Sequence, residues 1–407
     1  MPSTEDKCLL VYSYGMFDFD LILRLRPGLA RRGWSIAFVT HLFSVWLRAR
    51  ASRIPCTLLR RPSAAAPAAD FRFEDTPEAL LGLLSPSAAE HYRASASEAF
   101  DRACTAHPVR ALAQWNGLRL GGQVATAYAR AKGLRTIFFE LGNIEPKLFV
   151  DPEGVNAASR LAAHPEMLDR YAVDDEEIAA WREAFMARKR AATTIPQARR
   201  IMNINPWFPL DWFGALVLRA PQPLSMSVTQ RVALRLRLMR RSLPPAIRPT
   251  EPYVFAPLQV SEDTNLLLFS QHDNLGLIAK ADATARARGL RLVVKPHPAE
   301  RDVTLLESIA ALCARQGHLF TSHNTADLIE QAEAVITINS TVGLEAIAMG
   351  KPVTVLSESL YSGFTPRLAA VYAIAHLLDV YPFGREEASP QAVDRIIEIL
   401  EASPDAP

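Results

Sequence analysis

The sequence predicts an α/β protein made of two Rossmann-like domains that face a central cleft. Short apolar runs alternate with stretches of helical periodicity in two separate parts of the chain. Such runs, separated by helices, are typical of strands in a parallel sheet that is covered on both faces. A proline- and arginine-rich segment without this alternation divides the two series, and 407 residues are enough for two domains.

The first series predicts an N-terminal domain over residues 1–205. Its elements are expected in this order: a strand at 8–14, a helix at 18–32, strands at 35–40 and 111–116, a helix at 119–132, a strand at 136–140 and a charged helix at 174–194. Parallel strands with crossover helices between them give βαβ units.

The second series predicts a C-terminal domain over 253–388 and a final helix and tail over 389–407. Its strands are expected at 253–260, 290–296, 318–322, 334–339 and 352–356. The final helix begins with Ser389 in the N-cap position and Pro390 at the first helical position, both of which favour a helix start.

The segment between the domains, 206–252, is basic. It has seven arginines and no acidic residue between Asp211 and Glu251. We expect a helix near 226–242 that carries Arg235, Arg237, Arg240 and Arg241. This helix either binds anionic headgroups at the inner face of the cytoplasmic membrane or is a solvated linker.

Composition excludes several classes of protein. The net charge of +2 gives no global field for nucleic acid. The four cysteines are far apart and have no histidine at ligand spacing, so we expect no metal site and no disulfide framework. The polar, acidic N-terminus is unlike a signal peptide, and no apolar stretch approaches the ~18 residues of a spanning helix. We therefore expect a cytoplasmic protein.

The segment 334–353 combines a strand end with a polar turn and a helix start. The strand ends at Asn339, and Ser340 and Thr341 follow it. Backbone N–H groups at a helix start bind phosphate, and the two hydroxyls add donors. Glu345, one turn into the helix, is placed to accept hydrogen bonds from a ribose. The alternative is an ordinary strand, N-cap and helix.

Two more strands end in residues that suit a nucleotide. Lys295 and His297 follow a buried strand and alternate with prolines, and both side chains can donate to phosphate oxygens. Gln259 ends the first strand of the second series, where it can contact a base or sugar, although a solvated turn explains it equally well.

The N-terminal domain offers carboxylates for catalysis. Glu140 ends an apolar strand before a glycine turn, and Asp151 lies in the loop that follows. Burial would raise the pKa of such a carboxyl, as a general acid or base requires. A carboxylate can also be the nucleophile of retaining glycosyl transfer. The alternative is a surface loop with solvated acids.

Taken together, these motifs resemble bacterial capsule polysaccharide biosynthesis proteins of the KpsS/KpsC type, and the KpsS-like branch fits the chain length better. The strings that carry the resemblance are QWNGLR at 114–119, FELGN at 139–143, DPEGVN at 151–156, PLQVSEDTN at 257–265, KPHP at 295–298 and NSTVGLEAIAMGKPV at 339–353.

The resemblance implies a GT-B-like glycosyltransferase that transfers β-Kdo from CMP-Kdo with retention, to lyso-phosphatidylglycerol or a Kdo-primed acceptor. It implies a donor site without a metal or other cofactor, formed by Gln259, Lys295, His297, Asn339, Ser340, Thr341 and Glu345. The catalytic candidates are Glu140, Asp151 and His297. The chain departs from the family where Asn143, Ile144 and Glu145 precede Pro146, since an aromatic and a basic residue are usual there.

Three alternatives remain open. A UDP-sugar or a CDP-activated donor fits the same pocket pattern. A nonhydrolysing sugar-nucleotide epimerase shares the two-domain layout but needs further acids. A non-catalytic component of capsule assembly or export could keep the fold and a nucleotide pocket. The partners expected are a nucleotide-sugar donor, a lipid or glycolipid acceptor, the membrane surface and the capsule assembly machinery.

Overall fold

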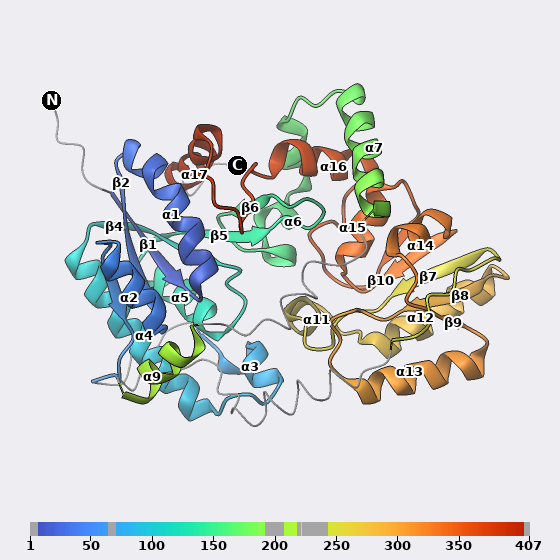
Figure 1. Ribbon diagram of the computed structural model, residues 1–407, viewed down its shortest axis with the longest axis horizontal. Coiled ribbons are helices and arrows are strands. Elements are labelled where there is room, and N and C mark those ends of the chain that lie inside the picture. Colours follow the sequence, from blue (N-terminus) through green and yellow to red (C-terminus); the bar gives the residue numbers. More distant parts are fainter. Residues whose placement is uncertain (1–6, 64–70, 192–206, 218–220, 222–242, 403–407) are drawn as a thin grey trace. The chain divides into compact units, whose positions relative to one another are not determined.

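The computed structural model describes residues 7–63, 71–191, 207–217, 221 and 243–402. The chain divides into two compact units. Unit 1 comprises Met1–Arg160, Ile204–Ser225 and Leu377–Pro407, and unit 2 comprises Leu161–Asn203 and Met226–His376. Each unit contains one sheet with helices around it, which confirms the predicted α/β class (Figure 1).

Unit 1 is built on a six-stranded sheet with the order β3-β2-β1-β4-β5-β6, parallel except for β6. Its strands are β1 (Lys7–Ser13), β2 (Trp34–Thr40), β3 (Cys56–Leu58), β4 (Val109–Trp115), β5 (Arg135–Leu141) and β6 (Leu148–Asp151). Its helices are α1 (Met16–Arg31), α2 (Phe43–Ala51), η1 (Phe73–Asp75), α3 (Pro77–Leu80), α4 (Pro86–Ala106), α5 (Leu120–Ala131), η2 (Asn156–Ala158), α9 (Phe208–Val217) and α17 (Pro390–Glu401), and α6 (Arg160–Ala163) lies at the unit boundary. The short strands β3 and β6 were not predicted.

Alternate residues of β1 supply the two cores of unit 1. Leu9 and Val11 face the core that α1 and α17 cover. Leu10 and Tyr12 face the other core, which α4 and α5 cover. Because successive side chains of a strand point to opposite faces, a strand buried on both sides is apolar throughout, as the sequence of β1 is.

Unit 2 has a five-stranded parallel sheet with the order β11-β10-β7-β8-β9. Its strands are β7 (Tyr253–Pro257), β8 (Arg291–Lys295), β9 (Leu319–Phe320), β10 (Ala334–Thr337) and β11 (Val353–Val355). Its helices are η3 (Pro165–Arg170), α7 (Asp175–Ala191), α11 (Thr264–Phe269), α12 (Asn274–Ala287), α13 (Val303–Gln316), α14 (Thr325–Gln331), α15 (Thr341–Ala348), α16 (Pro366–Val371) and the π-helical turn η4 (Tyr372–His376). All five strands of this sheet lie where apolar runs predicted them.

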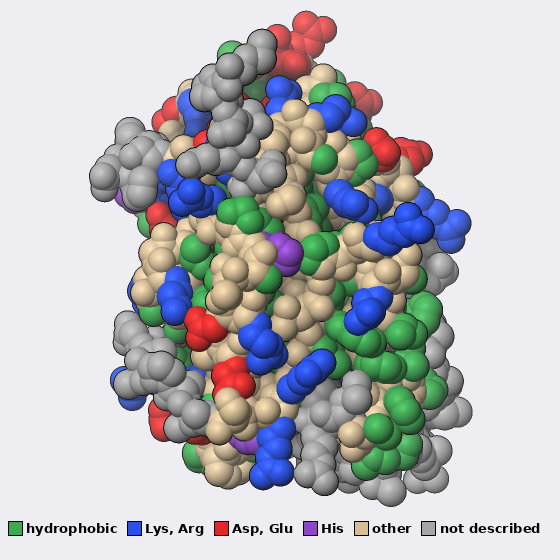
Figure 2. All heavy atoms as spheres, turned by 90° about the vertical axis from the view of Figure 1, so that its left-hand side faces the viewer, with side chains coloured by type: hydrophobic (Ala, Val, Ile, Leu, Met, Phe, Trp, Pro, Cys, Tyr) green, Lys and Arg blue, Asp and Glu red, His purple; other side chains and the backbone are tan. Residues whose placement is uncertain are grey.

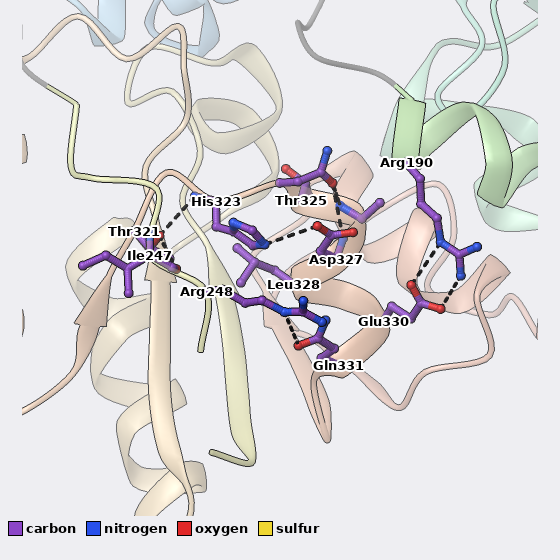
Figure 3. Close-up of polar contacts among 12 residues, drawn as sticks. Arg190, Ile247, Arg248, Thr321, His323, Thr325, Asp327, Leu328, Glu330 and Gln331 are labelled. Carbon is purple, nitrogen blue, oxygen red and sulfur yellow. Dashed lines mark hydrogen bonds and ion pairs between the residues drawn. The ribbon is translucent and has the colours of Figure 1, made fainter. Parts of the chain in front are cut away.

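Helix α7 packs in unit 2, although the sequence placed residues 161–203 in the N-terminal domain. Arg367 Nη1 donates to Asp175 Oδ1 at 2.6 Å, at the start of α7. Near its end, Arg190 forms two hydrogen bonds with Glu330 of α14 (Figure 3). The periodicity of α7 predicts a helix, but it does not show which part of the chain the charged face of α7 contacts.

Helix α17 packs in unit 1, so the predicted C-terminal segment belongs with the first sheet. A Cβ on Gly28 of α1 would lie 2.5 Å from Cγ2 of Val393, so glycine permits the close approach of the two helices. Lys7 Nζ donates to Glu401 at 2.7 Å. The predicted helix start is confirmed, because Ser389 Oγ accepts from Ala392 N at 3.2 Å.

The predicted interdomain segment divides between the units. Residues 207–217 include α9 of unit 1, whereas Ile247 in unit 2 donates from its N–H to Thr321 Oγ1 at 2.9 Å (Figure 3). The predicted basic helix near 226–242, with Arg235, Arg237, Arg240 and Arg241, lies outside the described residues.

Candidate functional site

The residues predicted to bind the donor lie at the carboxyl edge of the sheet of unit 2. Asn339 and Ser340 follow β10, Gln259 follows β7, and Lys295 ends β8. These three strands are parallel neighbours, so their carboxyl ends share one edge. The chain order of the strands reverses between β7 and β10, and open α/β sheets bind ligands at such switch points.

A reciprocal amide pair links the ends of β7 and β10. Gln259 Nε2 donates to Asn339 Oδ1 at 2.8 Å, and Asn339 N donates to Gln259 Oε1 at 3.0 Å. Both side chains are buried. Gln259 is held in turn by Asn274, whose Nδ2 donates to its carbonyl oxygen at 2.8 Å. The pair therefore fixes the turn that leads into α15.

The turn after β10 leads directly into the capped start of α15. Ser340 is the N-cap of α15, and its Oγ accepts from Val342 N at 3.3 Å. The hydroxyl of Tyr361 donates to Ser340 O. A Cβ on Gly343 would lie 2.5 Å from that hydroxyl, which explains glycine in the first turn. Thr341 is partly exposed as the first helical residue.

Lys295 lies at the same edge, and the pKa of its ammonium group is lowered. Its Nζ donates to His323 O at 2.5 Å and to Thr325 Oγ1 at 2.7 Å. Burial lowers the pKa of Lys295 to about 8, while the charges of Glu345 and Asp327 oppose that shift. An ammonium has three N–H donors, so these two bonds leave a third for a ligand oxygen.

His297 follows two residues after Lys295 and is held in one orientation. Its Nδ1 accepts from Ala299 N at 3.0 Å. In the neutral ring the proton must then be on Nε2. Lys295 ends β8 and His297 follows it, so both residues lie at the carboxyl end of this strand.

Glu345 has a partner that sequence reasoning missed. Lys189 Nζ, from α7, donates to Glu345 Oε1 at 2.5 Å. The side chains of Lys189 and Glu345 are 30% and 13% exposed, so the ion pair is partly shielded from water. Lys189 belongs to a helix whose charge pattern suggests only a solvated face. It adds a second lysine to the predicted donor residues.

Glu140 lies at the carboxyl end of β5 in unit 1. Asn116 Nδ2 donates to its Oε2, and Leu141 N donates to Oε1 at 2.9 Å. Asn116 and Gly117 both have positive φ, at 61° and 81°, which makes the tight turn after β4 that brings Asn116 to the carboxylate. The carboxylate is half-buried and fixed in orientation.

Asp151 lies elsewhere on the sheet of unit 1. It is opposite Phe138 in the antiparallel register of β5 and β6, so it lies farther than Glu140 from the carboxyl end of β5. Its Oδ1 accepts from the N–H groups of Glu153, Gly154 and Arg160 at 2.8–3.1 Å. These bonds make Asp151 the anchor of its loop.

A further buried carboxylate, Asp18, follows β1. It accepts from the N–H groups of Tyr14 at 2.6 Å and Gly15 at 3.0 Å, and from Ser13 Oγ at 3.0 Å. Burial raises the pKa of Asp18 to about 6 despite these bonds. Asp18 lies in the first turn of α1, and its carboxylate therefore caps the turn between β1 and that helix.

Comparison with known proteins identifies the family. The model of the family described as "Capsule polysaccharide biosynthesis protein" matches residues 110–365, which include Glu140 and every predicted donor residue. The chain belongs to this family.

Two known proteins match parts of this capsule biosynthesis protein. It is 25% identical over 260 residues to the capsule polysaccharide export protein KpsS of Escherichia coli, covering 58% of this chain and 64% of KpsS. The chain thus spans less than two thirds of that relative. It is 31% identical over 119 residues to the protein FixF of Sinorhizobium fredii, or 27% of each chain.

Among solved structures, the chain is similar to a β-Kdo 2,7 transferase, KpsC of Thermosulfurimonas dismutans. The sequence identity is 15%, the match covers 96% of this chain and 99% of the other, and the TM-score is 0.44. A β-Kdo 2,4 transferase, also KpsC of that organism, has 16% identity over 72% of this chain and 88% of the other, with a TM-score of 0.40.

Metal-binding clusters and membrane-spanning helices are both absent from the described residues. These residues contain no group of three or more His, Cys, Asp and Glu side chains arranged to hold a metal ion. Nor does the described part of the chain have a helix that is long and apolar enough to cross a bilayer.

Proposed function

We propose that this capsule biosynthesis protein is a glycosyltransferase that transfers β-Kdo from CMP-Kdo with retention. The observation that carries the proposal is the carboxyl edge of the unit 2 sheet, where Lys295 ends β8, His297 follows it, and α15 begins after β10. A charged lysine, a donating histidine and a helix start at one sheet edge favour a phosphate. The motif resemblance supplies the sugar and the nucleotide.

The proposed roles follow from the chemistry of each group. Unit 2 binds the donor: Lys295 and His297 donate to oxygens of the departing CMP phosphate at the sheet edge where α15 begins, and Glu345 accepts from the ribose hydroxyls. Lys295 supplies positive charge and His297 a further hydrogen bond, so no metal or other cofactor is proposed. The motif resemblance makes Glu140 the proposed nucleophile.

In the proposed reaction, a Glu140 oxygen forms a bond to the anomeric carbon of Kdo as the carbon–oxygen bond to CMP breaks. CMP leaves with that electron pair. The acceptor hydroxyl then attacks the same carbon, gives its proton to water and releases the Glu140 carboxylate, so two inversions give retention. The proposed acceptor is lyso-phosphatidylglycerol or a Kdo-primed lipid, and the protein would act on the inner face of the cytoplasmic membrane.

Calorimetry with CMP, CDP, UDP and ADP tests the donor. We expect CMP to bind best and His297→Ala to weaken it, with His91→Ala on the exposed side of α4 as the matched control. We then expect Glu140→Gln, with an unchanged circular dichroism spectrum, to abolish Kdo transfer from CMP-Kdo while leaving CMP affinity intact. If UDP or CDP binds better than CMP, the proposal of Kdo transfer is wrong, and a transferase with a UDP-sugar or CDP-activated donor replaces it.

A second function is favoured by one observation: the relative KpsS is named a capsule polysaccharide export protein. The chain would then be a non-catalytic component of the assembly or export machinery. Failure of all four nucleotides to bind well-folded protein, or CMP binding without turnover on any acceptor, would support this function over transfer.

A further inference from the structure

Helix α9 of unit 1 turns its apolar side chains to solvent. Its exposed residues are Pro209, Trp212, Phe213, Leu216 and Val217. Their spacing of i, i+3, i+4, i+7 and i+8 places them on one face of the helix. A surface helix ordinarily exposes polar residues on this face, but here every member is apolar. We call this set the α9 stripe.

The stripe is exposed although α9 is firmly attached to unit 1. Its opposite face carries Asp211 and Gly214, which are both buried. Asp211 Oδ1 accepts from Ser44 N at 2.8 Å, in the first turn of α2. A Cβ on Gly214 would lie 2.3 Å from Cβ of Phe43, so the helices are in close contact. The hydrogen bond to Asp211 and the close contact at Gly214 hold α9 against α2. The large apolar residues on the other face of α9 therefore face water.

The surface of α2 beside the stripe is aromatic and basic. Phe213 of the stripe lies against Phe43, with ring centroids 6.1 Å apart, and Phe43 stacks on Trp46. The exposed guanidinium of Arg50 lies over the Trp46 ring, 5.0 Å from its centroid. Leu47, one turn after Phe43, is 45% exposed. Aromatic rings with arginine at their edge are typical of residues at a membrane interface.

The stripe is exposed to an unusual degree for a surface in water. Trp212, Phe213, Leu216 and Val217 are 48–63% exposed. Figure 2 shows hydrophobic side chains gathered at the lower right of the face that it presents. A contiguous apolar area of this kind marks an interaction surface.

The charge of the chain around α9 indicates the partner. Between Asp211, which is buried, and Glu251 the sequence has seven arginines and no acidic residue. An anionic lipid surface complements them.

We propose that the α9 stripe inserts into the interfacial region of a bilayer that contains anionic phospholipid. Trp212, Leu216 and Val217 would enter the acyl boundary, and Arg50 would remain at the headgroups. This inference rests on the membrane association proposed above and names its surface. It does not depend on the identity of the sugar donor.

Co-sedimentation with vesicles tests the proposal on the full chain. The vesicles contain phosphatidylcholine with or without phosphatidylglycerol. We expect the wild type to bind only the anionic vesicles, and Trp212→Ser with Leu216→Ser to lower the partition coefficient about ten-fold or more. Leu275→Ser, at a 43% exposed leucine of α12, is the matched control and should bind as wild type.

Two further readouts locate the contact. Brominated lipids should quench the tryptophan emission of the wild type, and Trp212→Ser should remove most of that quenching. Replacing Arg235, Arg237, Arg240 and Arg241 by Gln should weaken binding mainly at low salt, since charge attraction is screened and apolar insertion is not.

Each outcome has one meaning. If the wild type binds no anionic vesicle, the membrane association itself is wrong. If the wild type binds and the double variant binds equally well, only the assignment to α9 is wrong. If the double variant changes a dimer to a monomer in sedimentation velocity and vesicle binding is unchanged, the stripe is a contact between copies. CMP affinity should be the same in all variants.

Discussion

The lowered pKa of Lys295 predicts how nucleotide affinity depends on pH. The pKa falls from 10.5 to about 8 because the ammonium is buried at the end of β8. From a pKa of about 8, roughly 90% of the side chains are charged at pH 7 and roughly 10% at pH 9. CMP keeps its doubly charged phosphate throughout this range, so the ligand does not cause the change.

The size of the effect follows from the loss of one charge. A hydrogen bond from a charged donor contributes about 1.5–3 kcal/mol and one from a neutral donor about 0.5–1.5 kcal/mol. Neutral Lys295 should therefore bind the phosphate about 1–2 kcal/mol more weakly, or about 5- to 30-fold. We expect the dissociation constant of CMP to rise above pH 8, with a midpoint at or above the pKa of free Lys295 because a bound phosphate raises it.

Stability should change in the opposite direction over the same range. The unfolded chain keeps the ordinary lysine pKa of 10.5, whereas folded Lys295 has lost its proton above about pH 8. Between these values the unfolded state binds more protons, so this group makes folding more favourable as pH rises. Deprotonation of Lys295 therefore does not itself destabilise the fold, and urea unfolding separates a loss of CMP affinity from a loss of stability.

Calorimetry with CMP from pH 7 to pH 9.5 tests this, with urea unfolding measured alongside. Arginine stays charged over this range, so Lys295→Arg should bind CMP with nearly constant affinity. Lys280→Arg, on the exposed face of α12, should keep the wild-type profile. A flat profile in the wild type, or the same loss of affinity in Lys295→Arg, would refute the reasoning.

Two further predictions concern the framework of unit 2. Asn339→Ala should lower the free energy of unfolding by roughly 1–3 kcal/mol, because it leaves Nε2 of the buried Gln259 amide without its acceptor, whereas Oε1 keeps the backbone N–H of residue 339. Adding Gln259→Ala should cost less than the sum of the two single changes in urea unfolding, and strict additivity would contradict the pairing. Lys189→Met should weaken CMP binding about 5-fold in calorimetry, since Glu345 loses the cation that orients it and a partly buried pair contributes about 1 kcal/mol. Arg190→Met, which breaks a more exposed pair on the same helix, is the control and should leave CMP affinity unchanged.

Much of the fold is determined by short-range patterns that the sequence displays directly. A strand buried on both faces must be apolar, so β1, β5 and β8 are evident from the chain alone. Parallel strands end at a common edge, so polar residues after several strands are expected to come together. In unit 2 this reasoning was sufficient: Gln259, Lys295 and Asn339 do meet at one edge.

The short strands β3 and β6 were not predicted. Their length of three or four residues does not by itself explain this, because β9 and β11 are as short and were predicted. Their pairing with a longer neighbour stabilises them. Strand β6 also pairs antiparallel with β5, so no crossover helix precedes it to indicate a strand in the sequence.

Tertiary structure alone decided which distant residues became partners. Lys189 and Glu345 are 156 residues apart, and Asp211 caps α2 from 167 residues away. The chain has 45 lysines and arginines and 43 aspartates and glutamates, so its charge pattern is compatible with many pairings and the sequence cannot select one. The sequence determined most of the strands, the helix caps and the sheet edge at which Gln259, Lys295 and Asn339 lie. Only packing determined that α7 and its lysine joined unit 2, that α17 joined unit 1, and that α9 buries Asp211 while it exposes its apolar face.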